Sequence, residues 1–391
     1  MVDGSRKNET AGIQPSLAEE IRSAIARSAW AGRTPDGANV TCIPFRDYME
    51  MCLYHPAYGY YRTGPTRVGR EGDFYTSAFV GDIMGEQLAE YMIELAGRNF
   101  PDGAAVEAVD WGGGTGRLGR QLLDAWRRKD GGERFFLTIV EGNPAHRGEA
   151  EAALQAEILA SRARVISPED AGREVWKDRR TIVVANELLD AFPVRRVARE
   201  GGRLREEGVY WDERRGRPAA CRMELIDSEP ETWLNRQNVR LREGQVTEFG
   251  AEGAEWTAWL YRLMGPALLI LIDYGDATRE LAGPHRMDGT LLCYENHLAH
   301  ADPFRNPGGS DLTAHVDFDL VRCRAEAAGW REIWYGSQKR FLVETGVLSK
   351  LSAHAISDPF DPLVRRNRSI RQLLLSDGMS ELFKVQVWER V

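Results

Sequence analysis

The feature of this sequence that most restricts its fold is a run of glycines at residues 110–116, between a predicted strand and a predicted helix. The segment reads DWGGGTG. A strand that ends in a carboxylate and breaks into glycines lets backbone N–H groups approach a ligand without obstruction by Cβ atoms. The segment therefore predicts a site for a nucleotide-like cofactor, with Asp110, Gly112, Gly114 and Gly116 as candidate contacts.

Strands and helices alternate along the chain from about residue 104 onward. Apolar runs predict strands at residues 104–111, 134–141, 165–166, 181–185, 267–272 and 383–388. Helical spacing of apolar residues predicts helices at 118–126 and 145–160. This order favours an α/β fold of the doubly wound, Rossmann-like type, with a largely parallel sheet.

The 391 residues divide into two predicted regions. Residues 1–100 are expected to form an N-terminal helical extension with loops that cover the cofactor and the substrate. Residues 101–391 are expected to form the core, interrupted at about 193–265 by an inserted hairpin and helical region.

Two local signals mark elements outside the predicted core. Ser16 and Glu19 have the spacing of a capping box at the start of a helix over 16–30. The pair Gly201 and Gly202, between two β-capable segments, predicts the inserted hairpin.

Composition restricts the class of protein. The chain has 51 Lys and Arg against 59 Asp and Glu, a net charge of −8, which is opposite in sign to that of a general nucleic-acid binder. The five cysteines never occur as C-x-x-C, which argues against a zinc site or a disulfide scaffold. Residues 1–20 lack an apolar signal core, and no apolar run approaches the ~20 residues that span a bilayer. We expect a cytoplasmic protein with no nucleic-acid partner and no membrane span.

Glu141, at the end of the next predicted strand, lies where a carboxylate can hold the hydroxyl groups of a ribose. Two cofactors suit this arrangement. Residues 114–119 also match the dinucleotide pattern G-x-G-x-x-G, which would make the protein an NAD-dependent oxidoreductase. However, the strand ends before Gly112, Asp110 lies where the amino-acid end of a cofactor needs an acceptor, and no second nucleotide-binding half follows. These points favour S-adenosyl-L-methionine, with NAD as the alternative.

Polar residues follow the predicted strand 181–185, at the sheet edge where ligands of such folds bind. Asn186 is a candidate cofactor contact, and Glu187 and Asp190 are candidate catalytic residues. If the segment turns helically, the two carboxylates fall three residues apart on one face and could hold one guanidinium group. Alternatively, Asp190 caps the following turn and Asn186 ties down the strand end.

A group of histidines and acids near the C-terminal third is a weaker signal. It consists of His297, His300, Asp311, His315 and Asp317. No spacing among them is a recognised metal-ligand set, so we expect hydrogen-bonded structural groups and no metal. His315 is a candidate general base or substrate-positioning residue.

Several segments together resemble the MidA-like family of S-adenosyl-L-methionine-dependent methyltransferases. The matching segments are residues 53–56, 59–61, 72–77, 110–116, 186–193, 273–275, 311–318, 338 and 341–342. The resemblance implies a seven-stranded class I methyltransferase core and a protein arginine as methyl acceptor. It also implies that the loop 72–77, with Gly72, Asp73 and Thr76, covers the cofactor, and that Asn186 and Glu187 face the reaction centre.

The chain departs from the family pattern in two places. Its glycine loop starts from Asp110 instead of Glu and has more consecutive glycines, and Ala78 and Phe79 replace a Ser/Pro-Glu type sequence. Cofactor binding tolerates these changes, but they leave the acceptor open. The alternatives to a protein arginine are a small-molecule acceptor and a noncatalytic assembly factor that retains the cofactor pocket.

Overall fold

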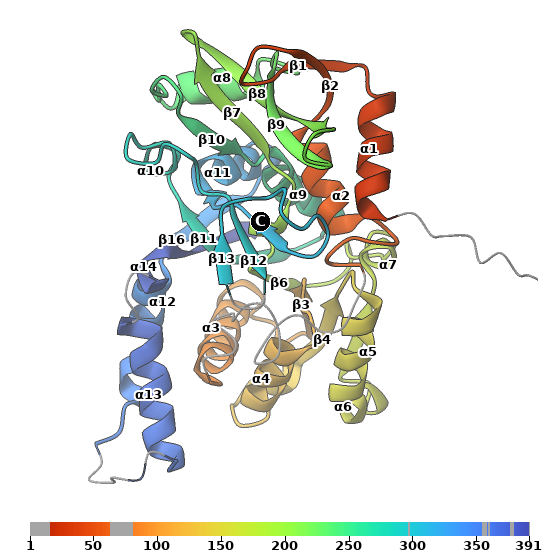
Figure 1. Cartoon of the computed structure of the whole chain (residues 1–391). Coiled ribbons are helices and arrows are strands. Elements are labelled where there is room, and N and C mark those ends of the chain that lie inside the picture. Colours follow the sequence, from red (N-terminus) through yellow and green to blue (C-terminus); the bar gives the residue numbers. More distant parts are fainter. Residues whose placement is uncertain are drawn as a thin grey trace, which may run out of the picture.

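A sheet of seven consecutive strands, with an eighth short strand beside one of them, lies at the centre of the protein (Figure 1). The structure, a computed structural model, describes residues 16–62, 81–295, 298–353, 358, 360–375 and 379–390. In spatial order the strands are β16 (Arg331–Ser337), β17 (Phe383–Arg390), β11 (Ala267–Asp276), β6 (Thr181–Asn186), β3 (Val106–Trp111), β4 (Phe135–Val140) and β5 (Ala163–Ile166).

The direction of these strands matches the predicted fold class. β17 runs antiparallel to both of its neighbours, whereas β11, β6, β3, β4 and β5 are mutually parallel. A short strand, β15 (Val316–Asp317), pairs in parallel with the end of β11. Strands β6 and β11 are continuous apolar runs because helices cover both faces of the sheet. The predicted doubly wound α/β fold with a seven-stranded mixed sheet is confirmed.

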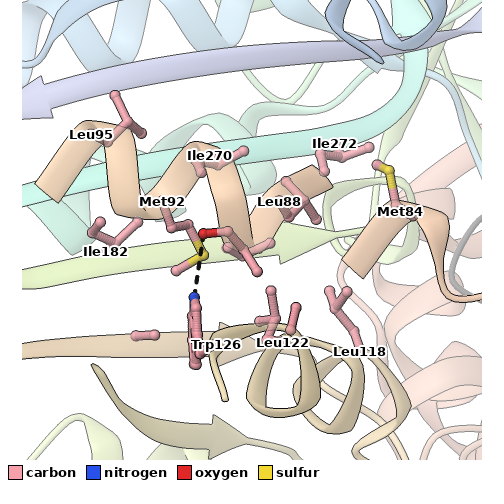
Figure 2. Close-up of a cluster of buried hydrophobic side chains, with 14 of the residues drawn as sticks. Met84, Leu88, Met92, Leu95, Leu118, Leu122, Trp126, Ile182, Ile270 and Ile272 are labelled. Carbon is pink, nitrogen blue, oxygen red and sulfur yellow. Dashed lines mark hydrogen bonds between the residues drawn. The ribbon is translucent and has the colours of Figure 1, made fainter. Parts of the chain in front are cut away.

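Helices α3 (Ile83–Asn99) and α4 (Arg117–Trp126) cover one face of the sheet. Figure 2 shows Leu88 and Met92 of α3 above Leu122 of α4, with Ile270 of β11 beside them. The indole N–H of Trp126 donates a hydrogen bond of 3.3 Å to a carbonyl oxygen of α3. Helix α3 therefore belongs to the core, so the core begins before residue 100, the boundary that we predicted.

Helices α9 (Ala251–Leu263) and α11 (Phe318–Ala328) pack on the other face. Their buried aromatic residues include Trp256 and Phe318. The remaining helices around the core are α5 (Pro144–Ala153), α6 (Gln155–Leu159), α7 (Pro168–Ala171), α10 (Thr278–Leu281), α12 (Gln338–Glu344), α13 (Pro362–Leu375) and α14 (Met379–Leu382). Short 3-10 turns occur at Gly132–Arg134, Leu189–Ala191 and Val347–Lys350.

A second sheet joins the N-terminal segment to the insertion (Figure 1, top). Its strands, in spatial order, are β10 (Val246–Phe249), β7 (Arg195–Glu200), β8 (Arg203–Asp212), β2 (Asn39–Pro44), β1 (Trp30–Arg33) and β9 (Arg217–Met223). β7 and β8 form the predicted hairpin around Gly201 and Gly202. Because β8 also pairs with β9, strands β8, β2, β1 and β9 close into a ring. The N-terminal segment therefore contributes two strands to this sheet, in addition to helices α1 and α2.

Three helices and a small sheet complete the described chain. α1 (Leu17–Arg27) begins with the predicted capping box, in which the Ser16 N–H donates to Glu19 Oε2 at 2.6 Å. The other two helices are α2 (Phe45–Tyr54) and α8 (Glu229–Arg236). The small sheet consists of β13 (Leu298–His300), β12 (Leu292–Glu295) and β14 (Asp311–Thr313).

Candidate active site

A cavity of about 620 Å³ lies at the carboxyl ends of β3, β4 and β6. The glycine loop and the turn after β6 form one side of it, and residues of α2 and α9 form the other. In an open α/β sheet this is the edge at which ligands bind. The cavity is therefore the candidate site that the sequence placed after β3.

The glycine loop turns sharply between β3 and α4. Gly112, Gly114 and Gly116 all have a positive φ. Gly113 has no room for a side chain, because a Cβ there would lie 2.9 Å from Asp110 Oδ2 and 2.8 Å from a methyl group of the buried Ile139. Gly112 and Gly114 line the cavity, whereas Gly116 precedes the first residue of α4 and is not part of the cavity wall. Their contacts to a cofactor stay a prediction.

Asp110 is a buried carboxylate on the cavity wall, with only 3% of its surface exposed. Its Oδ2 atom has no hydrogen-bond partner among the described residues. Burial, together with the neighbouring charge of Glu141, raises the pKa of Asp110 to about 7. A buried acceptor that faces a cavity suits a cationic group of a ligand, such as the α-ammonium group of an amino acid.

Glu141 also lines the cavity, immediately after β4. Its Oε2 accepts a hydrogen bond of 2.8 Å from the N–H of Gly114, and its Oε1 accepts one of 2.6 Å from the N–H of Asn143. The carboxylate is thus held against the glycine loop. This placement agrees with the predicted contact to a ribose, which stays a prediction.

Asn186 and Glu187 reach the cavity from the end of β6. Glu187 has a φ of +55°, which is rare for a residue with a side chain, and its N–H donates to the Ile272 carbonyl oxygen at 2.8 Å. Its Oε2 accepts a hydrogen bond of 2.6 Å from the Tyr274 hydroxyl, and its Oε1 accepts one of 3.2 Å from Asn186 Nδ2. The turn therefore places Glu187 at the cavity wall, with both carboxylate oxygens held by hydrogen bonds.

Asp190 is not part of the cavity wall, unlike Glu187. The two carboxylates do not share a helical face. The backbone of Glu187 lies in the left-handed region, and the chain then forms the 3-10 turn Leu189–Ala191. Asp190 is 5% exposed, and burial, with the nearby charges of Asp273 and Asp311, raises its pKa well above the usual range. The predicted grip of both carboxylates on one guanidinium group is not found.

His315 also lies outside the cavity wall. Its backbone N–H donates to Thr290 Oγ1 at 3.1 Å, and the ring atom Nδ1 has no hydrogen-bond partner among the described residues. Burial, which is the main cause, and the positive charge of Arg286 lower the pKa of His315 to about 4. This placement gives no support to the predicted catalytic role of His315.

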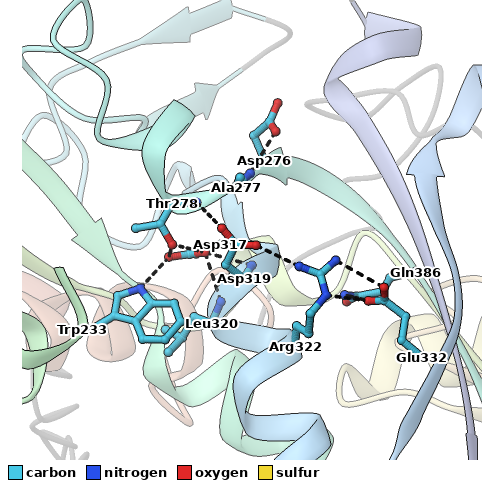
Figure 3. Close-up of polar contacts among 10 residues, drawn as sticks. All are labelled: Trp233, Asp276, Ala277, Thr278, Asp317, Asp319, Leu320, Arg322, Glu332 and Gln386. Carbon is cyan, nitrogen blue, oxygen red and sulfur yellow. Dashed lines mark hydrogen bonds and ion pairs between the residues drawn. The ribbon is translucent and has the colours of Figure 1, made fainter. Parts of the chain in front are cut away.

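Two of the other acids in this group, Asp317 and Asp311, have structural contacts, whereas neither ring nitrogen of His300 has a hydrogen-bond partner among the described residues, contrary to the expectation for this histidine. Asp317 caps α11 and accepts hydrogen bonds from the Thr278 hydroxyl and from Trp233 Nε1 (Figure 3). Asp311 accepts a hydrogen bond of 2.8 Å from the Tyr61 hydroxyl. No group of three or more His, Cys, Asp or Glu that could hold a metal is found among the described residues. His297 and the predicted cofactor contacts Gly72, Asp73 and Thr76 lie outside the described residues.

Sequence reasoning missed the residues that form the far side of the cavity. Glu50 and Tyr54 come from α2, and Glu252 and Trp256 come from α9. Their only sequence signal was an aromatic-rich stretch and an apolar helical pattern, which are equally typical of a core.

Comparisons with known proteins show the family of the chain. Residues 84–336 match the model of a family described as S-adenosyl-L-methionine-dependent methyltransferase. The chain is 26% identical to the mitochondrial protein arginine methyltransferase NDUFAF7 homolog of Drosophila melanogaster, over 83% of this chain and 76% of that one. It is also 26% identical to mitochondrial NDUFAF7 of Danio rerio, over 88% and 82% of the two chains.

A solved structure resembles the whole chain. It is a COG1565 superfamily member from Burkholderia thailandensis bound to S-adenosyl-homocysteine, with 30% identity and a TM-score of 0.81. The alignment covers 96% of this chain and 92% of that one.

These findings bear on several predictions. S-adenosyl-L-methionine is confirmed as the cofactor over NAD. None of the helices in the described parts of the chain is long and apolar enough to cross a membrane. The named relatives are mitochondrial, so they do not support the predicted cytoplasmic location. The chain belongs to this family of S-adenosyl-L-methionine-dependent methyltransferases, and S-adenosyl-L-methionine is its cofactor.

Proposed function

We propose that this methyltransferase modifies a guanidinium nitrogen of an arginine in a protein. The observation that carries the proposal is the fixed carboxylate of Glu187 on the cavity wall. The names of the relatives from Drosophila melanogaster and Danio rerio, both protein arginine methyltransferases, support the same acceptor.

The charge of the cavity wall also favours a cationic acceptor. Among the described residues, the wall has two arginines, Arg62 and Arg117, and six acidic side chains: Glu50, Asp110, Glu141, Glu169, Glu187 and Glu252. Three of the acids are paired with arginines, Glu50 and Glu252 with Arg46 and Glu169 with Arg62. A cleft lined mainly by one sign of charge attracts molecules of the opposite sign. The remaining excess of acidic groups favours a guanidinium group over a carboxylate or phosphate acceptor.

Different residues of the cavity wall are assigned to the cofactor and to the acceptor. We infer that Asp110, Glu141 and the glycine loop hold S-adenosyl-L-methionine, which supplies an electrophilic methyl group on a sulfonium when bound. Glu187 accepts a hydrogen bond from one guanidinium N–H and thereby turns the lone pair of that nitrogen toward the methyl group. Bound S-adenosyl-L-methionine would give up its methyl group to this nitrogen and leave as S-adenosyl-homocysteine, and the Glu187 carboxylate would be placed to accept the proton that the nitrogen loses.

The proposal is tested by incubating the protein with labelled S-adenosyl-L-methionine and arginine-containing peptides or cell extract, and by identifying the labelled residue by mass spectrometry. We expect methylarginine. In Glu187→Gln the rate should fall roughly 10- to 100-fold, because a hydrogen bond to a charged group contributes about 1.5–3 kcal/mol. Affinity for S-adenosyl-homocysteine should stay the same in a calorimetric titration.

The matched control is Glu255→Gln. Glu255 lies on α9, pairs with Arg324 Nε at 3.1 Å and does not line the cavity, so its substitution should leave turnover unchanged. Label on a hydroxyl, a carboxylate or a small molecule, or normal turnover in Glu187→Gln, would refute the proposed acceptor chemistry.

A further inference from the structure

Residues at the end of β11 contact the turn that contains Glu187. These β11 residues do not line the cavity themselves. Asp273 is 1% exposed, and its Oδ2 accepts hydrogen bonds from three successive N–H groups of that turn. The distances are 3.1 Å to Leu188, 2.8 Å to Leu189 and 3.3 Å to Asp190. One buried carboxylate therefore fixes the backbone immediately after Glu187.

Tyr274 fixes the side chain of the same residue. Its hydroxyl donates to Glu187 Oε2 at 2.6 Å, and its ring packs against Phe383 with the ring centroids 4.3 Å apart. Burial and the charge of Glu187 raise the pKa of the Tyr274 hydroxyl well above its usual range, so it remains a donor at neutral pH.

Gly275, the next residue, lets the strand end lie close to β15. It pairs with Val316, and a Cβ at Gly275 would collide with the Val316 carbonyl oxygen. Three consecutive residues thus have three different roles at one point: Asp273 binds the backbone of the turn, Tyr274 binds the carboxylate, and Gly275 permits the packing that holds the strand end.

We propose that Asp273 and Tyr274 are positioning residues for Glu187. A residue with a side chain adopts a φ of +55° only where its surroundings hold it there. The three hydrogen bonds from the turn to Asp273 supply that constraint. The Tyr274 hydroxyl then selects the orientation of the carboxylate that faces the acceptor. This inference rests on the proposed function, because it assigns Glu187 to orienting the acceptor nitrogen.

The first test is Tyr274→Phe, which removes one hydroxyl and keeps the ring packing. We expect kcat for the methyl acceptor to fall about tenfold, as a lost hydrogen bond to a charged group implies. The dissociation constant of S-adenosyl-homocysteine should change less than about twofold. Tyr48→Phe is the matched control, because the Tyr48 hydroxyl donates at 2.7 Å to the Pro303 carbonyl oxygen in the core, outside the cavity wall. It should leave kcat unchanged.

The second test is a double-mutant cycle with Glu187→Gln. If Tyr274 acts through Glu187, Tyr274→Phe should change the remaining rate of Glu187→Gln less than about twofold. A purely structural effect of Tyr274 would instead lower the rate by the same factor in both backgrounds, and that result would overturn the inference.

Asp273→Asn provides an independent measurement. It keeps the shape of the side chain but replaces one carboxylate oxygen with an N–H donor, which opposes the N–H of Tyr274 that now donates at 2.9 Å. We expect lower kcat with unchanged affinity for S-adenosyl-homocysteine, and circular dichroism shows whether the variant is folded. If this variant does not fold, the double-mutant cycle of Tyr274→Phe with Glu187→Gln tests the positioning role without it.

The outcomes separate this inference from the proposed function. Normal kcat in Tyr274→Phe, together with a large loss in Glu187→Gln, would refute the positioning role and leave the arginine proposal intact. Label on a residue other than arginine, with the cycle as expected, would refute the acceptor and retain the positioning role.

Discussion

Cofactor binding should release a proton from Asp110. The pKa of this carboxyl group is about 7 in the protein without ligand, and a cationic amino group placed against it would favour the ionised form. With this pKa the group is about 90% protonated at pH 6 and about 10% at pH 8. Binding of S-adenosyl-homocysteine, which carries the same amino group, should therefore release about 0.9 proton at pH 6 and about 0.1 at pH 8.

The number of protons is measured by calorimetric titration in buffers with different enthalpies of ionisation, because the observed enthalpy changes linearly with that of the buffer. Asp110→Asn is the control: the amide cannot release a proton, so the slope at pH 6 should vanish. Its affinity for the ligand should fall roughly 10- to 100-fold through loss of a charge-assisted hydrogen bond. A slope near zero in the natural protein at pH 6, or an unchanged slope in Asp110→Asn, would show that Asp110 does not pair with the cofactor.

The same carboxyl group links pH to the stability of the ligand-free protein. Its pKa in the folded state, about 7, exceeds the usual 3.8, so its contribution to stability is complete below pH 3.8 and is lost as the pH rises through 7. A difference of about three units corresponds to at most about 4 kcal/mol. Asp110→Asn should therefore unfold at a higher temperature than the natural protein at pH 8, without ligand.

Two further predictions concern packing and charge. Gly113→Ala should lose about 1–3 kcal/mol of unfolding free energy and most of its cofactor affinity, because the added methyl group collides with Ile139; thermal unfolding with and without S-adenosyl-homocysteine measures both. Its control, Gly148→Ala in α5, meets no atom within 4 Å and should gain about 0.5–1 kcal/mol. Glu206→Ala should lose about 1–3 kcal/mol in urea unfolding, because it removes a fully buried carboxylate that pairs with Arg195 at 2.7 and 3.0 Å and accepts the Ile226 N–H at 3.2 Å, whereas Arg195 keeps Asp227 as a partner. A loss below about 1 kcal/mol, or a weaker affinity for S-adenosyl-homocysteine, would contradict that explanation.

The parts of the fold that the sequence predicts are those with local signals. The strands of the central sheet are short apolar runs, and the glycine loop and Glu141 follow two of them directly, so their positions could be derived from spacing alone. The ring formed by β1, β2, β8 and β9 could not, because residues 30–44 pair with residues 203–223 across more than a hundred and fifty intervening residues. No local pattern specifies such a partner.

The geometry after β6 shows a second limit of sequence reasoning. Three-residue spacing suggests a shared helical face for Glu187 and Asp190, but it assumes that the backbone is helical at both. The backbone is decided instead by Asp273, which lies more than eighty residues later and collects the N–H groups of the turn. The conformation of this turn therefore depends on the carboxylate of the neighbouring strand, and the spacing of Glu187 and Asp190 does not predict it.

Long-range contacts also connect the two sides of the cavity. The cofactor half consists of loops that follow directly from the sheet, whereas the opposite half includes α2, which is tied to the rest of the site. The Tyr54 hydroxyl donates to the Ala191 carbonyl oxygen at 2.9 Å, and Arg46 bridges Glu50 of α2 to Glu252 of α9. We therefore expect substitutions in α2 to affect the turn that follows Glu187 and the α9 side of the cavity more than the glycine loop. It follows that variation of the acceptor among relatives should be sought in α2 and α9, and not in the cofactor loop.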